Sequence, residues 1–143
     1  MSIPFEDNLF DAVYFTEVLE HIAVTNPTVI FTEIRRVLKP NGLLVFSTPN
    51  ICNLSNIYAL MNDINIFWAS EIFYGSLDRH NREFTPKEVQ ALHQNAGFAE
   101  IIMYGINCDS NWRTGTGEFI YDLISKMGDG HPMLRNTIMV LAR

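Results

Sequence analysis

The sequence lacks the features that mark several large classes of protein. Only 10 of its 143 residues are lysine or arginine, and 16 are acidic. The resulting net charge of −6 argues against a nucleic-acid binder, which usually carries a basic surface. No apolar run approaches the ~18 residues that a membrane-spanning helix needs. The first residues, MSIPFEDN, show neither the basic nor the apolar region of a secretory signal.

Cysteine is also scarce. The two cysteines, Cys52 and Cys108, do not have the spacing of a metal-binding motif. One disulfide between them is arithmetically possible, but we favour a reduced pair in a cytoplasmic protein. What is present is apolar material: 48% of the residues are hydrophobic and 18% are charged, which suits a globular chain with a real core. A length of 143 residues corresponds to about one domain.

The first half of the chain predicts a strand, a helix and a second strand. The apolar run Phe10–Phe15 predicts a buried strand, and Thr16–Ile22 reads as the strand's end, a loop and the start of a helix. Residues 28–39 have helical periodicity, with Asn26 and Pro27 in favourable positions at its start. Pro40–Gly42 predicts the end of this helix and a turn, and Leu43–Phe46 predicts a second strand parallel to the first.

The second half continues the alternation of helices and strands. Thr85, Pro86 and Glu88 form a capping-box pattern at the start of a helix that Gly97 ends. The fold class is therefore α/β, and in such sheets ligands bind beyond the carboxyl ends of parallel strands. The other expected elements are helices over Leu54–Met61 and Glu118–Met127, a break at Gly128–Gly130, and strands over Glu100–Tyr104 and Thr137–Leu141.

The stretch TEVLEHI, Thr16–Ile22, stands at that expected ligand edge. In a helix, Glu17, Glu20 and His21 would lie on one face, at positions i, i+3 and i+4. Such a face could be a metal site, an acid/base pair, one wall of a cofactor pocket, or only the polar side of a helix. The residues alone leave all four open.

Three stretches, taken in order, carry a resemblance to a known family. They are IPFEDNLFDAVYFTEVLEHI, RRVLKPNGLLVFSTPN and RHNREFTPKEVQALHQNAGF. Together they resemble class I S-adenosylmethionine-dependent methyltransferases of the type 11/23 kind, a group that includes ubiquinone-biosynthesis-type O-methyltransferases and enzymes of glycan pathways. The resemblance covers roughly residues 3–105 and is not specific for a substrate.

The resemblance implies the C-terminal portion of a Rossmann-like methyltransferase fold, with strands 4 to 7 of the family sheet. The Gly-rich loop and the acidic strand end that bind the cofactor in the family have no counterpart in this sequence. GTGE at Gly115–Glu118 does not replace that loop, because it follows no clear strand. We therefore expect residues 1–143 to form a single partial methyltransferase domain.

The resemblance also assigns roles to residues. It implies S-adenosylmethionine as the cofactor. A divalent metal at Glu17, Glu20 and His21 is not favoured, because the LEH sequence is widespread in methyltransferases that bind no metal. Asp11 is expected to make a structural hydrogen bond, and the aromatics Phe67, Trp68, Phe73 and Tyr74 to form a lid or to pack. His93 and His131 are expected at surface and turn positions. The implied site comprises catalytic His21 and His80, cofactor-binding Phe15, Thr16, Glu17 and Glu20, and substrate-binding Asn50, Arg79 and Arg82.

The function that follows is methyl transfer, favoured as O-methylation, to a small-molecule or glycan-like acceptor. The alternative is a catalytically silent fragment or module that lacks the cofactor-binding half. A nicotinamide-dependent enzyme is weaker, because it needs the same absent loop. Without its family neighbour, the strand Phe10–Phe15 becomes an apolar edge, so we expect a homodimer or a separate N-terminal partner.

Overall fold

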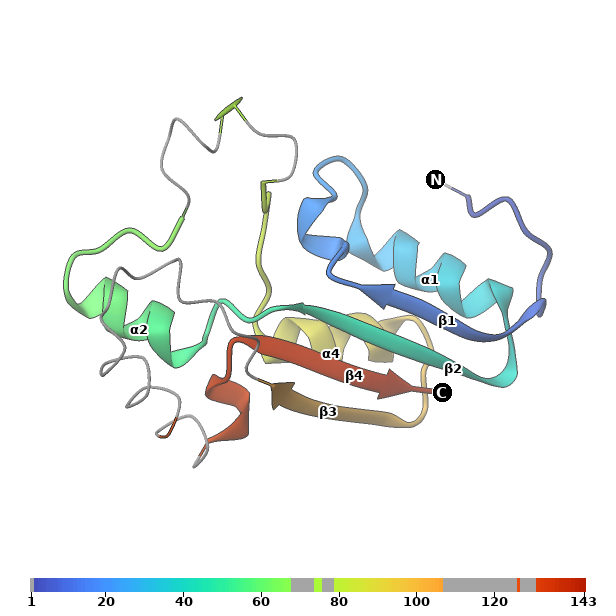
Figure 1. The fold of residues 1–143 in the computed structure, drawn as a ribbon. Helices are drawn as coiled ribbons and strands as arrows, with labels where there is room; N and C mark the ends of the chain where they lie inside the picture. Colours follow the sequence, from blue (N-terminus) through green and yellow to red (C-terminus); the bar gives the residue numbers. More distant parts are fainter. Residues whose placement is uncertain (1, 68–73, 76–78, 107–125, 127–130) are drawn as a thin grey trace.

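A four-stranded mixed sheet organises the part of the chain that the structure, a computed structural model, describes (Figure 1). The strand order is β1-β2-β4-β3, with β1 parallel to β2 and with β4 antiparallel to both of its neighbours. The described residues are 2–67, 74–75, 79–106, 126 and 131–143. The strands are β1 (Phe10–Thr16), β2 (Leu38–Pro49), β3 (Ile101–Ile106) and β4 (Thr137–Ala142). The α/β class and the parallel first pair are confirmed.

Helix α1 (Pro27–Val37) joins β1 to β2 and begins as predicted, because the Asn26 side chain accepts a hydrogen bond from the Thr28 amide at 2.9 Å. Its end differs from the prediction. Strand β2 begins at Leu38, directly after the helix, and Pro40–Gly42 is a bulge within the strand rather than a turn before it. Leu38 is fully buried and pairs with Phe10, so burial and strand pairing outweigh the turn-forming preference of the three residues that follow.

The later elements agree closely with the sequence prediction. Helix α4 (Pro86–Asn95) carries the complete capping box of Thr85 and Glu88, and Gly97 takes a φ of 87°, which favours glycine. Helix α2 (Leu54–Met61) is present at the expected residues, and a short 3-10 turn, η2 (Pro132–Leu134), precedes β4. The predicted Glu118–Met127 helix, except for Lys126, and the Gly128–Gly130 break lie outside the described residues, as does Cys108.

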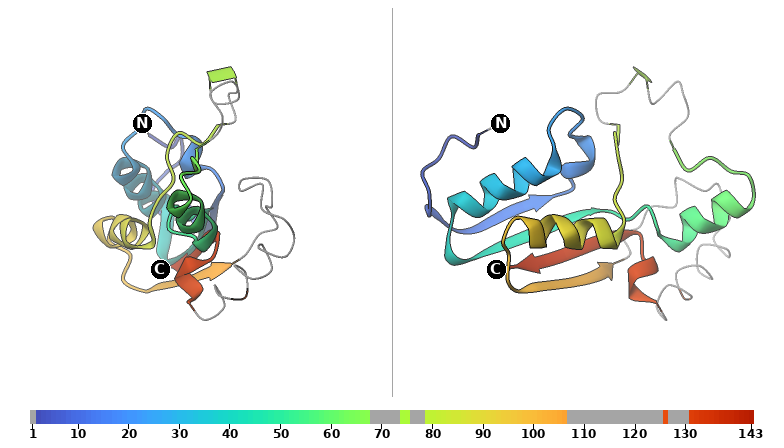
Figure 2. Two further views of the ribbon diagram at one scale, coloured as in Figure 1. Left: turned by 90° about the vertical axis from the view of Figure 1, so that its left-hand side faces the viewer. Right: turned by 180° about the vertical axis from the view of Figure 1, so that it is seen from behind.

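Helices α1 and α4 lie side by side on one face of the sheet, and the core forms between them and the strands (Figure 2). Phe31 from α1 and Phe46 from β2 are both fully buried at its centre. No described helix is long and apolar enough to cross a bilayer.

His93 corrects one prediction, because it lies in this core and not at the surface. It is 0% exposed, and its ring packs against Phe31 at 4.7 Å and against Phe46 at 5.2 Å between centroids. The Nδ1 atom lies 2.8 Å from the Val89 carbonyl oxygen, so the ring is tied to its own helix. Burial lowers the pKa of His93, which keeps the imidazole neutral. The spacing of apolar residues along the predicted helix does not show whether a histidine such as His93 lies in the core or at the surface.

Within the described sheet, β1 is an edge strand, as the sequence predicts for a chain without the family's first strand. Its Tyr14 side chain is 75% exposed. Asp11, at the start of the strand, forms an ion pair with Lys39 at 2.8 Å, which is a structural contact of the kind expected.

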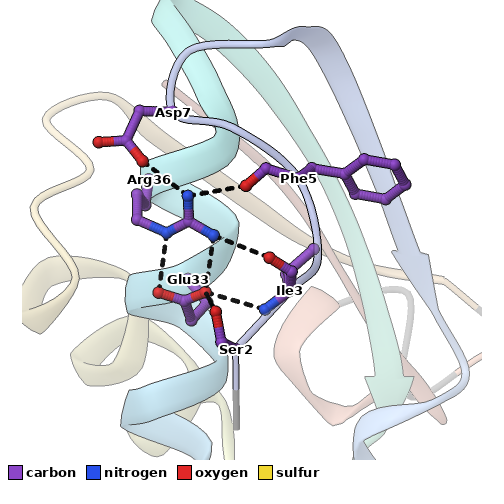
Figure 3. A network of polar contacts seen from close by, with 6 residues as sticks. All are labelled: Ser2, Ile3, Phe5, Asp7, Glu33 and Arg36. Atoms are coloured by element: carbon purple, nitrogen blue, oxygen red, sulfur yellow. Dashed lines mark hydrogen bonds and ion pairs between the residues drawn. The ribbon is translucent and has the colours of Figure 1, made fainter.

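A network around Arg36 attaches the chain before β1 to helix α1 (Figure 3). The guanidinium donates to the carbonyl oxygens of Ile3 and Phe5, each at 2.9 Å, and to Asp7 at 2.6 Å. It also makes two 2.9 Å bonds to the carboxylate of Glu33, whose Oε2 accepts from the Ile3 amide as well. The hydrogen bonds from Arg36 lower the pKa of Glu33 to about 2.

Candidate active site

The chain bends sharply where β1 ends, and this bend sets the geometry of the site. Glu17 takes a φ of 52°, a left-handed conformation, and its amide donates to the Ser47 carbonyl oxygen at 3.0 Å. A single 3-10 turn, η1 (Leu19–His21), follows, and the residue before it, Val18, makes no side-chain cap. Thr16 belongs to the strand and pairs with Ser47, so the strand end expected in Thr16–Ile22 is present, but the helical part is a single 3-10 turn and not the start of an α-helix.

The bend separates Glu17 from the other two residues of the ExxEH pattern. The Glu17 carboxylate accepts a hydrogen bond from the Ser47 hydroxyl at 2.7 Å, so it lies against the end of β2. The single helical face that the spacing predicted for Glu17, Glu20 and His21 does not form, because only the last two residues lie in η1.

Glu20 is a buried carboxyl group with one unsatisfied oxygen. The side chain is 0% exposed, and its Oε2 accepts from the Thr48 hydroxyl at 3.0 Å. No hydrogen-bond partner for Oε1 exists among the residues that the structure describes. Burial, the largest cause, raises the pKa of Glu20, and the nearby charge of Glu17 acts in the same direction.

The segment 79–83 returns over η1 and brings a second imidazole to the site. The His21 and His80 rings meet edge to face, with their centroids 4.9 Å apart. His21 Nδ1 lies 3.1 Å from the Arg79 carbonyl oxygen, and His80 Nδ1 lies 2.9 Å from Glu83 Oε1. The Arg79 and Glu83 oxygens act as hydrogen-bond acceptors, so each neutral ring carries its hydrogen on Nδ1. The lone pair of each neutral ring is then on Nε2.

Backbone bonds hold this segment in place. The Asn81 amide donates to the Glu20 carbonyl oxygen at 2.7 Å, and the Arg82 amide donates to the same oxygen at 3.3 Å. The Asn81 side chain donates to the His21 carbonyl oxygen, also at 2.7 Å. The predicted residues Glu20, His21 and His80 thus form one cluster, to which Arg79 contributes its carbonyl oxygen.

Other predicted site residues lie elsewhere or face other partners. The Arg82 guanidinium stacks over the Phe84 ring at 4.8 Å and bonds to Glu88, which directs it toward a shallow groove beside α4. Asn50 is fully buried, and its amide nitrogen donates to the carbonyl oxygens of Met133 at 2.6 Å and Arg135 at 2.8 Å. Asn50 therefore anchors the turn before β4, and its role toward a substrate stays a prediction.

The two predicted cofactor residues of β1 point in different directions. The Phe15 ring packs toward the core, 6.0 Å from the Phe46 centroid, whereas Thr16 is exposed at the strand end. Of the predicted aromatic lid, Phe67 and Tyr74 are exposed, and Trp68 and Phe73 lie outside the described residues.

Four further residues shape the site. Ser47 and Thr48, at the end of β2, supply hydroxyl groups to the two glutamates; the sequence places them at this sheet edge but does not show these bonds. Asn81 and Glu83 had no comparable signal, because their partners His21 and His80 meet only through the fold.

Comparison with known proteins identifies the fold. A family model described as a methyltransferase domain matches residues 1–46. An S-adenosylmethionine-dependent methyltransferase from Archaeoglobus fulgidus aligns with a TM-score of 0.57 and 18% identity, covering 95% of this chain and 60% of that chain. A Thermotoga maritima protein described as a possible histamine N-methyltransferase gives a TM-score of 0.60 and 18% identity, covering 99% of this chain and 59% of that chain.

A third structure contains the cofactor. Phosphoethanolamine N-methyltransferase 2 from Haemonchus contortus, in complex with S-adenosylmethionine, gives a TM-score of 0.53 and 19% identity, covering 96% of this chain and 34% of that chain. A search of curated proteins found no match. The comparisons confirm the Rossmann-like methyltransferase fold, and the chain spans about 60% or less of the length of these structures.

Proposed function

We propose that this chain, with a methyltransferase-domain match over residues 1–46 and a methyltransferase fold, is the acceptor-side part of an S-adenosylmethionine-dependent methyltransferase. The observation that carries the proposal is the polar cluster of Glu20, His21 and His80 beyond the carboxyl ends of two parallel strands. Ligands bind at that edge in open α/β sheets. We also propose that residues 1–143 form one partial domain and act in the cytoplasm.

The residues present fit one wall of a cofactor pocket. Thr16 and Glu17 are exposed at the end of β1, next to a strand edge that has no neighbour among the described residues. S-adenosylmethionine, when bound, supplies a methyl group on a sulfonium sulfur. In this proposal Thr16, Glu17, Glu20 and the backbone of Phe15 line the wall, and the chain's main contribution is to orient the acceptor for in-line attack.

The acceptor that we propose is a hydroxyl group on a small molecule or a glycan-like compound. Its oxygen would form the new bond to the methyl carbon while the bond from that carbon to the sulfonium sulfur breaks and leaves a neutral thioether, and the hydroxyl proton must leave. His21 and His80 suit this task, because each neutral ring has a lone pair on Nε2 that can accept the proton. Arg79, Arg82 and Asn50 are the proposed substrate contacts. Since one structural neighbour is a phosphoethanolamine N-methyltransferase, nitrogen acceptors belong in the same screen.

A second function is favoured by the position of β1 at the edge of the described sheet and by the length of the neighbours, which this chain covers only in part. In that case the chain is catalytically silent by itself and works only with a separate N-terminal partner or as a homodimer that pairs through β1.

Calorimetry with S-adenosylmethionine separates the two functions. Binding by the folded 143-residue chain supports an autonomous enzyme, and a Glu17→Gln variant should then bind more weakly than a control changed at the exposed Tyr74. Absence of binding by a folded sample contradicts autonomous activity. Light scattering on the same sample tests the β1 edge, because a stable monomer would contradict the proposed dimer.

A further inference from the structure

The unsatisfied oxygen of Glu20 is not explained by methyl transfer. The carboxyl group is 0% exposed, and one of its oxygens has no hydrogen-bond partner among the described residues. Leaving a buried polar atom unpaired costs about 1–3 kcal/mol of folding free energy. A ligand that pairs with this oxygen would offset that cost. An oxygen in that state is ready to accept a cation or a proton.

The two imidazoles beside Glu20 are held as metal-binding histidines usually are. A histidine that ligates a metal through one nitrogen almost always donates its other N–H to a carbonyl or carboxylate oxygen. Here His21 Nδ1 faces the Arg79 carbonyl oxygen, and His80 Nδ1 faces the Glu83 carboxylate. Both Nε2 atoms are thereby set as acceptors, and His21 Nε2 lies 3.8 Å from Glu20 Oε1.

We propose that Glu20, His21 and His80 together bind one divalent transition-metal ion of the zinc class. One ligand atom from each residue lies within 4.8 Å of the other two. Ligand atoms that share a tetrahedral Zn²⁺, with bonds of about 2.0–2.2 Å, lie about 3.3–3.6 Å apart, so small side-chain rotations close the site. Two nitrogens and one carboxylate oxygen suit zinc-class ions better than Mg²⁺, which prefers oxygen ligands.

This set is not the one that the ExxEH spacing suggests. Glu17 bends away at the left-handed position and accepts its hydrogen bond from Ser47, and His80 arrives from a segment about 60 residues later. Three protein ligands leave a fourth position for water or for an acceptor oxygen. On binding, the ion replaces any proton on Glu20 and joins η1 to the segment 79–83 through side chains as well as backbone.

The experiment titrates the full chain, freed of metal, with Co²⁺ as the probe, and follows the visible absorption of tetrahedral cobalt. We expect uptake of one Co²⁺ per chain and its displacement by Zn²⁺. Glu20→Gln and His80→Gln should each weaken binding at least about tenfold, and Glu83→Met should weaken it by about 10–100-fold because it removes the carboxylate that accepts from His80. Glu17→Gln removes a nearby charge but no ligand and should weaken binding less than Glu20→Gln does, and the control His131→Gln should keep wild-type affinity.

Three results would overturn the site: no uptake by the folded wild type, uptake unchanged in Glu20→Gln and His80→Gln, or uptake lost in Glu17→Gln alone. Circular dichroism checks that each variant folds, and the affinities of Glu20→Gln and His80→Gln test the site independently of each other. The measurement needs neither S-adenosylmethionine nor an acceptor. A failure to bind metal therefore does not contradict the proposed methyl transfer. A failure to bind S-adenosylmethionine likewise does not contradict the metal site.

Discussion

Two charged clusters flank strand β1, and they differ in how completely their polar atoms are paired. Before the strand, Arg36 binds four oxygen-bearing partners, and both oxygens of Glu33 accept hydrogen bonds (Figure 3). After the strand, Glu20 accepts one side-chain bond from Thr48, and its second oxygen has no hydrogen-bond partner among the residues that the structure describes. The Arg36 and Glu33 side chains are half-buried, as are those of His21 and His80, whereas the Glu20 side chain is fully buried.

The difference separates a structural role from a functional one. In the Arg36 network, the guanidinium and the Glu33 carboxylate bond to each other and to the N-terminal segment. The effect of this network is to hold the N-terminal segment on α1. An unsaturated buried group stores free energy that a ligand can recover, and strained or unsatisfied groups of this kind gather at functional sites. Four changes test this contrast.

Thr48→Val should have the largest effect, because it removes the hydroxyl that donates to Glu20. The buried carboxyl then has no side-chain donor, and we expect the free energy of unfolding at pH 7 to fall by about 1–3 kcal/mol. Urea denaturation measures the change. The control Thr32→Val loses a hydroxyl that bonds to Thr28 in an exposed turn, and it should stay within about 0.5 kcal/mol of wild type. Equal losses in both variants would contradict the contrast.

Glu20→Gln should stabilise the metal-free chain, by about 1 kcal/mol at pH 7, because an amide carries no buried charge. The pKa of Glu20 is raised above 4.5 in the folded state, so the folded chain holds more protons than the unfolded chain just above pH 4.5. Wild-type stability therefore falls as the pH rises from 4.5 through the folded pKa, and the variant lacks this fall. Parallel pH profiles of the two proteins, from thermal melts, would refute the burial argument.

Arg36→Met should release the N-terminal segment without disturbing the site. The amides of Asn8 and Leu9 bond to the carbonyl oxygens of Arg36 and Val37, and we expect their hydrogen exchange to speed up by at least about tenfold. Arg35→Met, at the next position of the same helix, is the control and should leave both amides protected. Faster exchange at His21 as well would show that the two clusters are coupled.

Glu33→Gln should give the smallest effect, with the opposite pH dependence to Glu20→Gln. The pKa of Glu33 falls from 4.5 to about 2 on folding, chiefly through its bonds to Arg36. Its contribution to stability is full above pH 4.5 and is lost as the pH falls toward 2. The difference in melting temperature between wild type and variant should therefore shrink across that window, and a constant difference would exclude this origin.

Local signals in the sequence predicted the helices and strands well. Asn26 with Pro27 and Thr85 with Glu88 act within a few residues, so their caps can be read without the fold. The predicted alternation of strands and helices also placed Thr16–Ile22 at the carboxyl end of a parallel strand, where the structure has it.

The site itself could be predicted only in part. Buried Glu20 is hydrogen-bonded to Thr48, which lies in a different part of the chain, on β2. The contact of His80 with His21 depends on the path by which segment 79–83 comes back to the site. His93 was misplaced for the same reason, because an aromatic core from three elements surrounds it. Contacts between distant segments, rather than local preference, decide these positions.

The bond between His21 and the Arg79 carbonyl oxygen spans 58 residues of sequence, and this separation has a kinetic consequence. Strands β1 and β2 are joined through one helix, so their pairing closes a short loop and can form early. Closure of the site must wait for a far longer loop, and a longer loop costs more entropy to close. During synthesis, the ribosome must add the residues after Arg79 before His21 finds its partner. The site thus forms after the pairing of β1 with β2, whereas the pairing of β2 with β4 joins residues that lie still farther apart in the sequence.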